Sequence, residues 1–75
     1  MDILNFIELL VEQFDDVNVS ELTPETNFKE LDDYSSIVAL SIIGMIDDEF
    51  GITLKGDDLR NSTTINDLFS LIEKK

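Results

Sequence analysis

Apolar residues recur at spacings of three and four along three segments of the chain, and this periodicity limits the fold to packed amphipathic helices. The segments cover residues 2 to about 15, 35 or 36 to about 50, and about 64 to 75. Their apolar stripes consist of Ile3, Phe6, Ile7, Leu10 and Phe14, then Val38, Ala39, Ile42, Ile43, Ile46 and Phe50, then Ile65, Leu68, Phe69 and Ile72. We find no strand pattern and expect an all-α fold.

Capping residues support the ends of these helices. Asp2 is a candidate N-cap for the first helix, and Gly51 fits a C-cap for the second. The segment Thr64-Ile65-Asn66-Asp67 is similar to a capping box, with Asp in the place of the usual Glu. A short helix is expected at residues 57–60, with Leu59 pointing inward.

The polar stretch between the first two long helices predicts a long loop. Residues 18–35 include Pro24 among Ser, Thr, Asn and acidic residues, which favour turns. We expect Leu22, Phe28 and Leu31 to pin this loop to the core. The expected architecture is therefore a small four-helix bundle of three longer helices and one short helix, formed by residues 1–75 as a single domain.

The residue types that are missing exclude most enzyme classes. The 75 residues contain no cysteine and no histidine, so there is no disulfide, no thiolate metal site and no imidazole base. No Gly-x-Ser-x-Gly nucleophile elbow is present, which argues against a small hydrolase. The acidic runs lack the ordered Asp-x-Asp-x-Asp-Gly pattern of a calcium loop, so we expect no specific metal site. The composition indicates a protein that is not an enzyme.

The charge balance indicates the kind of partner. The chain has 17 Asp and Glu against 5 Lys and Arg, a formal net charge of -12. Such a charge disfavours nucleic acid and anionic membranes and favours partners with basic surfaces. It also favours a monomer. The N-terminal residues lack a basic region, and no apolar run approaches the length of a membrane span, so we expect a cytoplasmic protein with no membrane insertion.

A second stripe on the middle helix is half apolar and half acidic. A solvated face is the ordinary interpretation of acids on a helix, and single surface hydrophobes are common. Acids near a helix C-terminus are, however, mildly unfavourable for the helix dipole. We therefore expect this stripe to bind partners. Its residues are Ile37, Leu40, Ser41, Gly44, Asp47 and Asp48.

Four motifs in order resemble the acyl carrier protein family, in its bacterial type, over nearly the whole chain. They are Leu22-Thr-Pro-Glu-Thr-Asn-Phe-Lys-Glu-Leu31, Ser35-Ser36-Ile37, Ile46-Asp-Asp-Glu-Phe-Gly-Ile52 and Thr63-Thr-Ile-Asn-Asp-Leu68. Where the family usually has Asp-Ser-Leu, this chain has Ser35-Ser36-Ile37, so the usual aspartate is replaced by Ser35. The family's acidic residue at position 41 is Ser41 here.

The resemblance implies a mechanism. Ser36 would carry a 4′-phosphopantetheine arm, transferred from coenzyme A by a phosphopantetheinyl transferase, and acyl groups would be held on its thiol as thioesters. The implied role is fatty-acid or specialised lipid or polyketide-type biosynthesis, with acyl-handling enzymes as partners. Ser35 is the less favoured attachment residue. The alternative is an acidic helical docking module that binds a basic partner without a covalent cofactor.

Overall fold

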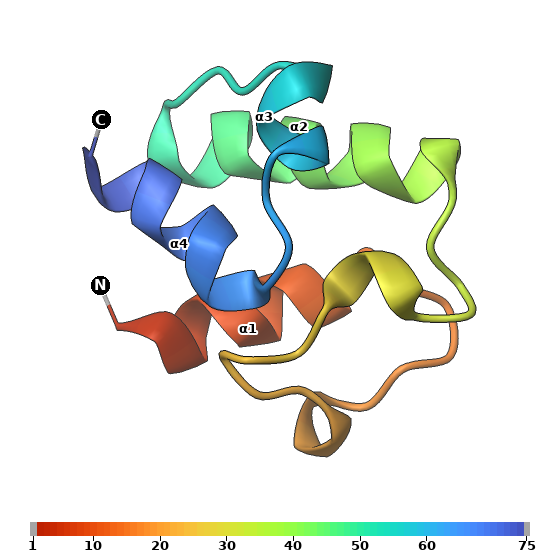
Figure 1. The fold of residues 1–75 in the computed structure, drawn as a ribbon. Helices are drawn as coiled ribbons and strands as arrows, with labels where there is room; N and C mark the ends of the chain where they lie inside the picture. Colours follow the sequence, from red (N-terminus) through yellow and green to blue (C-terminus); the bar gives the residue numbers. More distant parts are fainter. Residues whose placement is uncertain (1, 75) are drawn as a thin grey trace.

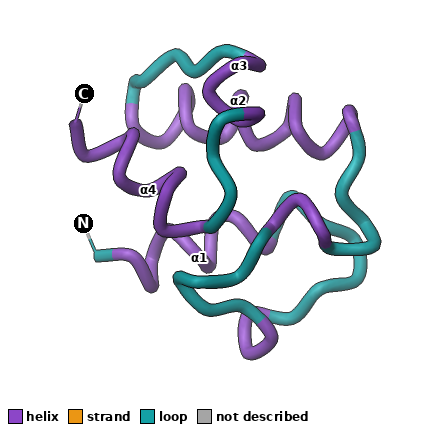
Figure 2. The backbone as a smooth tube through the Cα atoms, viewed as in Figure 1, coloured by secondary structure: helices purple, strands orange, loops and turns teal. Residues whose placement is uncertain are grey.

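Four α-helices form the regular structure of the chain in a computed structural model that describes residues 2–74 (Figure 1). They are α1 (Ile3–Val11), α2 (Ser36–Phe50), α3 (Gly56–Arg60) and α4 (Ile65–Lys74). The connection between α1 and α2 contains two single 3₁₀ turns, Val19–Glu21 and Phe28–Glu30, and no strand occurs within residues 2–74 (Figure 2). The expected all-α architecture of three longer helices and one short helix is confirmed.

Phe6 of α1 lies where three helices meet. Its side chain is fully buried, with its ring centroid 6.0 Å from that of Phe50 in α2 and 5.5 Å from that of Phe69 in α4. Both ring pairs are tilted, an arrangement that favours contact between the edge of one aromatic ring and the face of another. The apolar stripes predicted from the sequence thus converge on one core.

The long loop is tied to the core and to the start of α4. Leu22 and Phe28 are buried as expected, whereas Leu31 is only half-buried. The N–H groups of Ile65 and Asn66 donate to the carbonyls of Thr26 and Pro24, at 3.0 and 2.8 Å. These bonds satisfy N–H groups at the beginning of α4 that have no partner inside the helix. The loop therefore has a defined path across the bundle (Figure 1).

The first helix is shorter than its apolar periodicity predicts. Asp2 caps it as expected, since its carboxylate accepts the N–H of Asn5 at 3.0 Å, but α1 ends at Val11 rather than near residue 15. Beyond it, the N–H of Phe14 bonds to the carbonyl three residues earlier. The N–H of Asp16 then donates to the carboxylate of Asp33 at 2.8 Å, across the loop. Phe14 still reaches the core from this tighter turn.

The second helix has the predicted bounds but a narrower buried face. Gly51 ends it in the left-handed conformation, with φ 68°, and donates to the carbonyl of Asp47 at 3.0 Å, as a C-cap does. The buried residues of α2 are Ile42, Met45 and Ile46. The sequence pattern missed Met45 and placed Val38, Ala39, Ile43 and Phe50 on the buried stripe, whereas these four residues are half-buried. Ala39 and Ile43 line a cavity between α2 and α3, described below.

Asp67 completes the predicted capping box at the start of α4. The hydroxyl of Thr64 accepts the N–H of Asp67 at 3.1 Å, and the Asp67 carboxylate accepts the N–H groups of Thr64 and Thr63 at 3.1 and 3.0 Å. The shorter Asp side chain therefore replaces Glu without losing the reciprocal bonds. These hydrogen bonds, that from Thr64 foremost, hold the pKa of Asp67 below its ordinary value of 3.8.

Because the pKa of Asp67 is lower in the folded state than in the unfolded state, its ionised form stabilises the fold above the unfolded value. That contribution is lost as the pH falls through the folded pKa. We expect Asp67→Asn to lower stability near neutral pH and to flatten the dependence of unfolding free energy on pH below about 4. Urea unfolding at several pH values measures both effects. An unchanged acid dependence would contradict the assignment.

No helix within residues 2–74 combines the length and apolar character needed to cross a membrane. Within the same residues, no group of three or more acidic side chains is arranged to hold a metal ion.

Candidate functional site

Ser35 and Ser36 have different roles at the start of α2. Ser35 has extended backbone geometry, and its hydroxyl accepts the N–H of Val38 at 3.3 Å, so it is the N-cap. Its carbonyl accepts the first helical bond, from Ala39, at 2.9 Å. Ser36 is the first helical residue and is exposed, and within residues 2–74 its hydroxyl has no hydrogen-bond partner. The free hydroxyl of the pair is therefore that of Ser36.

The first turn of α2 also offers free donors beside this hydroxyl. The N–H groups of Ser36 and Ile37 make no hydrogen bond to any other residue in the described part of the chain. Unpaired N–H groups and the positive end of the helix dipole favour an anion at this position. Ser35, unlike an aspartate at that position, adds no negative charge of its own. A phosphate group attached to Ser36 would meet a favourable electrostatic environment.

An apolar cavity of about 340 Å³ opens next to Ser36. It lies between α2 and α3, and its apolar lining comes from Ala39, Leu40 and Ile43 of α2 and Leu59 of α3. Ile43 is half-buried because it faces this space rather than the centre of the core. Leu59 is buried, as the sequence predicts. The cavity offers an apolar chain a surface that begins at the Ser36 side chain.

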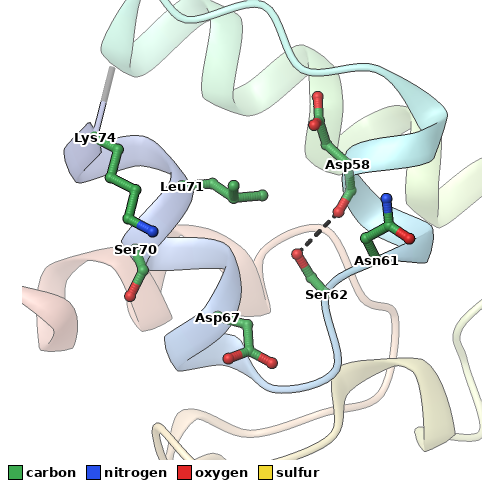
Figure 3. Close-up of a pocket in the computed structure, with 7 residues that line it drawn as sticks. All are labelled: Asp58, Asn61, Ser62, Asp67, Ser70, Leu71 and Lys74. Atoms are coloured by element: carbon green, nitrogen blue, oxygen red, sulfur yellow. Dashed lines mark hydrogen bonds between the residues drawn. The ribbon is translucent and has the colours of Figure 1, made fainter.

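A larger cavity of about 470 Å³ lies between α3 and α4, and none of its lining residues belongs to α2. Figure 3 shows Asp58 and Asn61 across from Ser70 and Lys74. The Ser62 hydroxyl, which is buried, donates to the carbonyl of Asp58 at 2.9 Å. Its lining is polar except for Leu71, so this cavity does not suit an acyl chain.

The stripe predicted to bind partners runs along the exposed side of α2. Ile37 and Leu40 are 76% and 68% exposed, and both are large apolar side chains. Gly44, Asp47 and Asp48 are exposed too, whereas Ser41 is half-buried. The only ion pair within residues 2–74 joins Arg60 to Asp57, so neither Asp47 nor Asp48 is neutralised by a described cation. The stripe presents an apolar part next to Ser36 and an acidic part at the other end of the helix.

Two residues near Ser36 were not singled out as site residues by the sequence pattern. Tyr34 and Arg60 both line the apolar cavity with it. The Tyr34 ring packs edge-on against Phe28, with centroids 5.8 Å apart, and partial burial raises the pKa of its phenol. Arg60 reaches the cavity from the last turn of α3. Tyr34 lies two residues before Ser36 in the chain, but no motif marks it. Arg60 is distant in sequence and comes near Ser36 only because α3 and α2 line one cavity.

Comparison with known proteins yields one family and a set of relatives. The chain is 31% identical to the acyl carrier protein of Exiguobacterium sp. over 58 residues, an alignment that covers 77% of this chain and 73% of the relative. It is 27% identical to the acyl carrier protein of Thermobifida fusca over 73 residues, an alignment that covers 97% of this chain and 92% of the relative. Residues 5–72 match the family described as "Phosphopantetheine attachment site". The chain belongs to the acyl carrier protein family.

Another relative has a longer chain. The meromycolate extension acyl carrier protein of Mycobacterium tuberculosis is 27% identical over 73 residues, which are 97% of this chain but 64% of the relative. The chain thus spans a little under two thirds of that relative's length.

Membership in the acyl carrier family makes this protein a carrier in lipid biosynthesis rather than an enzyme, with covalent 4′-phosphopantetheine as its prosthetic group. The residues around Ser36 fit that group. An exposed hydroxyl can accept the phosphodiester, unpaired N–H groups can face its charge, and an apolar cavity lies within reach of the arm. Acyl-handling enzymes are the partners of such a carrier.

Proposed function

We propose that Ser36 carries the 4′-phosphopantetheine arm and that the protein presents acyl groups to biosynthetic enzymes through α2. The observation that supports this most is that the hydroxyl groups of the two serines differ in their hydrogen bonding. The hydroxyl of Ser35 is engaged in capping α2, while that of Ser36 is exposed and free. Both serines are exposed, but Ser35 caps α2 through its hydroxyl oxygen, whereas Ser36 can react without disturbing the cap.

The attachment step needs little from the chain itself. The Ser36 oxygen would form a bond to the phosphorus of coenzyme A that bears pantetheine, while the bond from that phosphorus to the bridging oxygen of the diphosphate breaks. The nucleotide portion would leave with the electron pair of that bond, and the hydroxyl proton would pass to a base of the transferase. The free N–H groups of Ser36 and Ile37 would be available to the phosphodiester. When attached, the arm supplies the thiol on which acyl groups are held as thioesters. The chain has no cysteine, so this thiol would be the protein's only one.

The cargo belongs to fatty-acid or specialised lipid or polyketide-type synthesis in this proposal. Relatives named acyl carrier protein and meromycolate extension acyl carrier protein support a lipid pathway. The net charge of -12 supports partner enzymes with basic surfaces, the phosphopantetheinyl transferase among them. A monomeric state and a cytoplasmic location stay predictions.

Intact mass after incubation with coenzyme A and a broad-specificity phosphopantetheinyl transferase tests the proposal. We expect one phosphopantetheine increment. Cleavage after Lys29 and Lys55 releases a peptide of residues 30–55 that contains both candidate serines, and its fragment ions distinguish Ser35 from Ser36. An increment on Ser35 would overturn the assignment of the site. No increment with transferases of several kinds would favour the docking module without a covalent cofactor.

The acidic part of the stripe is expected to accelerate recognition by the transferase. Electrostatic steering by complementary charge raises association rates, most strongly at low salt. We expect Asp47→Asn with Asp48→Asn to lower kcat/KM for modification by about tenfold at low ionic strength, and by less at high salt. The initial rate at which the unmodified protein gains the phosphopantetheine mass, at carrier concentrations well below KM, gives kcat/KM.

The matched control removes the same charge from another helix. Glu8 and Glu12 are exposed residues of α1 and its C-cap, outside the stripe. Glu8→Gln with Glu12→Gln should leave kcat/KM close to the wild-type value. An equal loss in both double variants would mean that net charge alone, not the stripe on α2, determines recognition.

A further inference from the structure

The cavity beside Ser36 contains an unusual residue for so acidic a protein. Arg60 is the only arginine of the chain, one of 5 cations among 17 acids, and it lines the same cavity as Ser36. None of the lysines within the described residues lines this cavity. The only arginine of the chain therefore lines the same cavity as the serine that, in our proposal, carries a phosphodiester.

The present partner of Arg60 holds it weakly. Its guanidinium pairs with the carboxylate of Asp57 one turn earlier in α3, and the two side chains are 78% and 74% exposed. Exposed ion pairs of this kind contribute little to stability, so exchange for another anion costs little. The Arg60 backbone, in contrast, belongs to α3, and its carbonyl also accepts a hydrogen bond from Lys29 Nζ at 2.9 Å. The base of the side chain is fixed and its charged end can change partner.

A phosphodiester on Ser36 is the stronger partner for this guanidinium. Arginine binds phosphate oxygens through two parallel N–H groups, a geometry in which it exceeds lysine. The start of α2 suits the anion of this pair, since Ser35 brings no competing negative charge and the N–H groups of Ser36 and Ile37 are free. The anion would then be held from two sides, by the helix end and by α3.

We propose that Arg60 is a positioning residue that leaves Asp57 and pairs with the phosphodiester at Ser36, which directs the base of the arm along the apolar cavity. This inference rests on the proposed attachment at Ser36. It adds a role for α3 that the attachment itself does not require, since the transferase reaction uses only the serine hydroxyl. Asp57 is the alternative partner that Arg60 keeps in the unmodified protein.

The unique arginine allows a direct test in the wild-type protein. In ¹⁵N-labelled protein, Arg60 gives the only arginine Nε–H signal, and we expect this signal to shift when the unmodified protein is converted to the phosphopantetheinylated form. The single phosphorus of the arm gives one ³¹P resonance, which we expect to move in Arg60→Gln and to return toward its original position in Arg60→Lys. High salt should reduce the difference between wild type and Arg60→Gln.

Lys55→Gln is the matched control. It removes one positive charge from an exposed residue next to α3 that does not line the cavity, and its ³¹P resonance should stay at the wild-type position. Asp57→Asn removes the competing carboxylate and should enlarge the Arg60 shift on modification. Circular dichroism should show that each variant keeps its helix content, as expected for changes at exposed side chains.

The outcomes separate this inference from the proposed function. Normal modification of Ser36 with an unmoved Arg60 signal, or with equal ³¹P shifts in Arg60→Gln and Lys55→Gln, overturns the role of Arg60 and leaves the carrier site intact. Absence of any increment on Ser36 overturns both.

Discussion

Ser36→Ala is expected to abolish phosphopantetheinylation completely, while Ser35→Ala remains a substrate. Alanine at position 36 has no side-chain hydroxyl to form the bond to phosphorus, so the arm cannot be attached at this residue. The wild-type hydroxyl of Ser36 is exposed and has no hydrogen-bond partner within residues 2–74, so its loss should change the free energy of unfolding by less than about 0.5 kcal/mol. The variant therefore separates loss of chemistry from loss of fold.

Ser35→Ala provides the matched comparison. It removes the hydroxyl that accepts the Val38 N–H, and loss of an N-cap typically costs about 0.5–2 kcal/mol. We expect lower stability with modification retained, the opposite of the result at position 36. Intact mass and urea unfolding on both variants measure the two properties. An increment lost only in Ser35→Ala would show that the wrong serine was assigned.

Phe6→Ala is expected to be the most destabilising change in the core, reducing the free energy of unfolding by about 3–5 kcal/mol. The side chain is fully buried and touches aromatic rings of α2 and α4, so alanine would leave a cavity where three helices meet. Domains of this kind are stable by only about 5–15 kcal/mol, so the variant should lose a large part of its stability. Urea denaturation followed by circular dichroism gives the value.

Leu4→Ala is the control on the same helix. Leu4 is 65% exposed, and its truncation should change stability by no more than about 0.5 kcal/mol. If Leu4→Ala and Phe6→Ala had similar effects, α1 would not be oriented as described, because the two positions would then be equally buried.

Features carried by neighbouring residues were predictable from the sequence. The bounds of α2 follow from Ser35 as N-cap and Gly51 as C-cap, and the capping box of α4 follows from Thr64 and Asp67. Each of these signals acts over three or four residues through backbone hydrogen bonds, so no information about the rest of the fold is needed. The family motifs around Ser36 are likewise local and pointed to phosphopantetheine.

Features that depend on distant residues were missed. Periodicity extended α1 to residue 15, but the helix ends at Val11, and Asp33, seventeen residues along the chain, binds the N–H of Asp16 just beyond it. The same pattern assigned Ile43 to the core, whereas packing of α3 leaves it at the edge of a cavity. Neither outcome has a signal within the helix concerned, because each is decided by a segment that folds back from elsewhere.

By itself, the sequence determined that the chain forms four helices, where α2 begins and ends, the acidic charge and the serine pair at the start of α2, since these follow from local hydrogen bonding, apolar spacing and composition. Only the tertiary structure decided that an apolar cavity opens beside Ser36 and that Arg60 lines it. The reason is geometric: α3 follows α2 by a short connection, but its position over the start of α2 depends on how the two helices share the core.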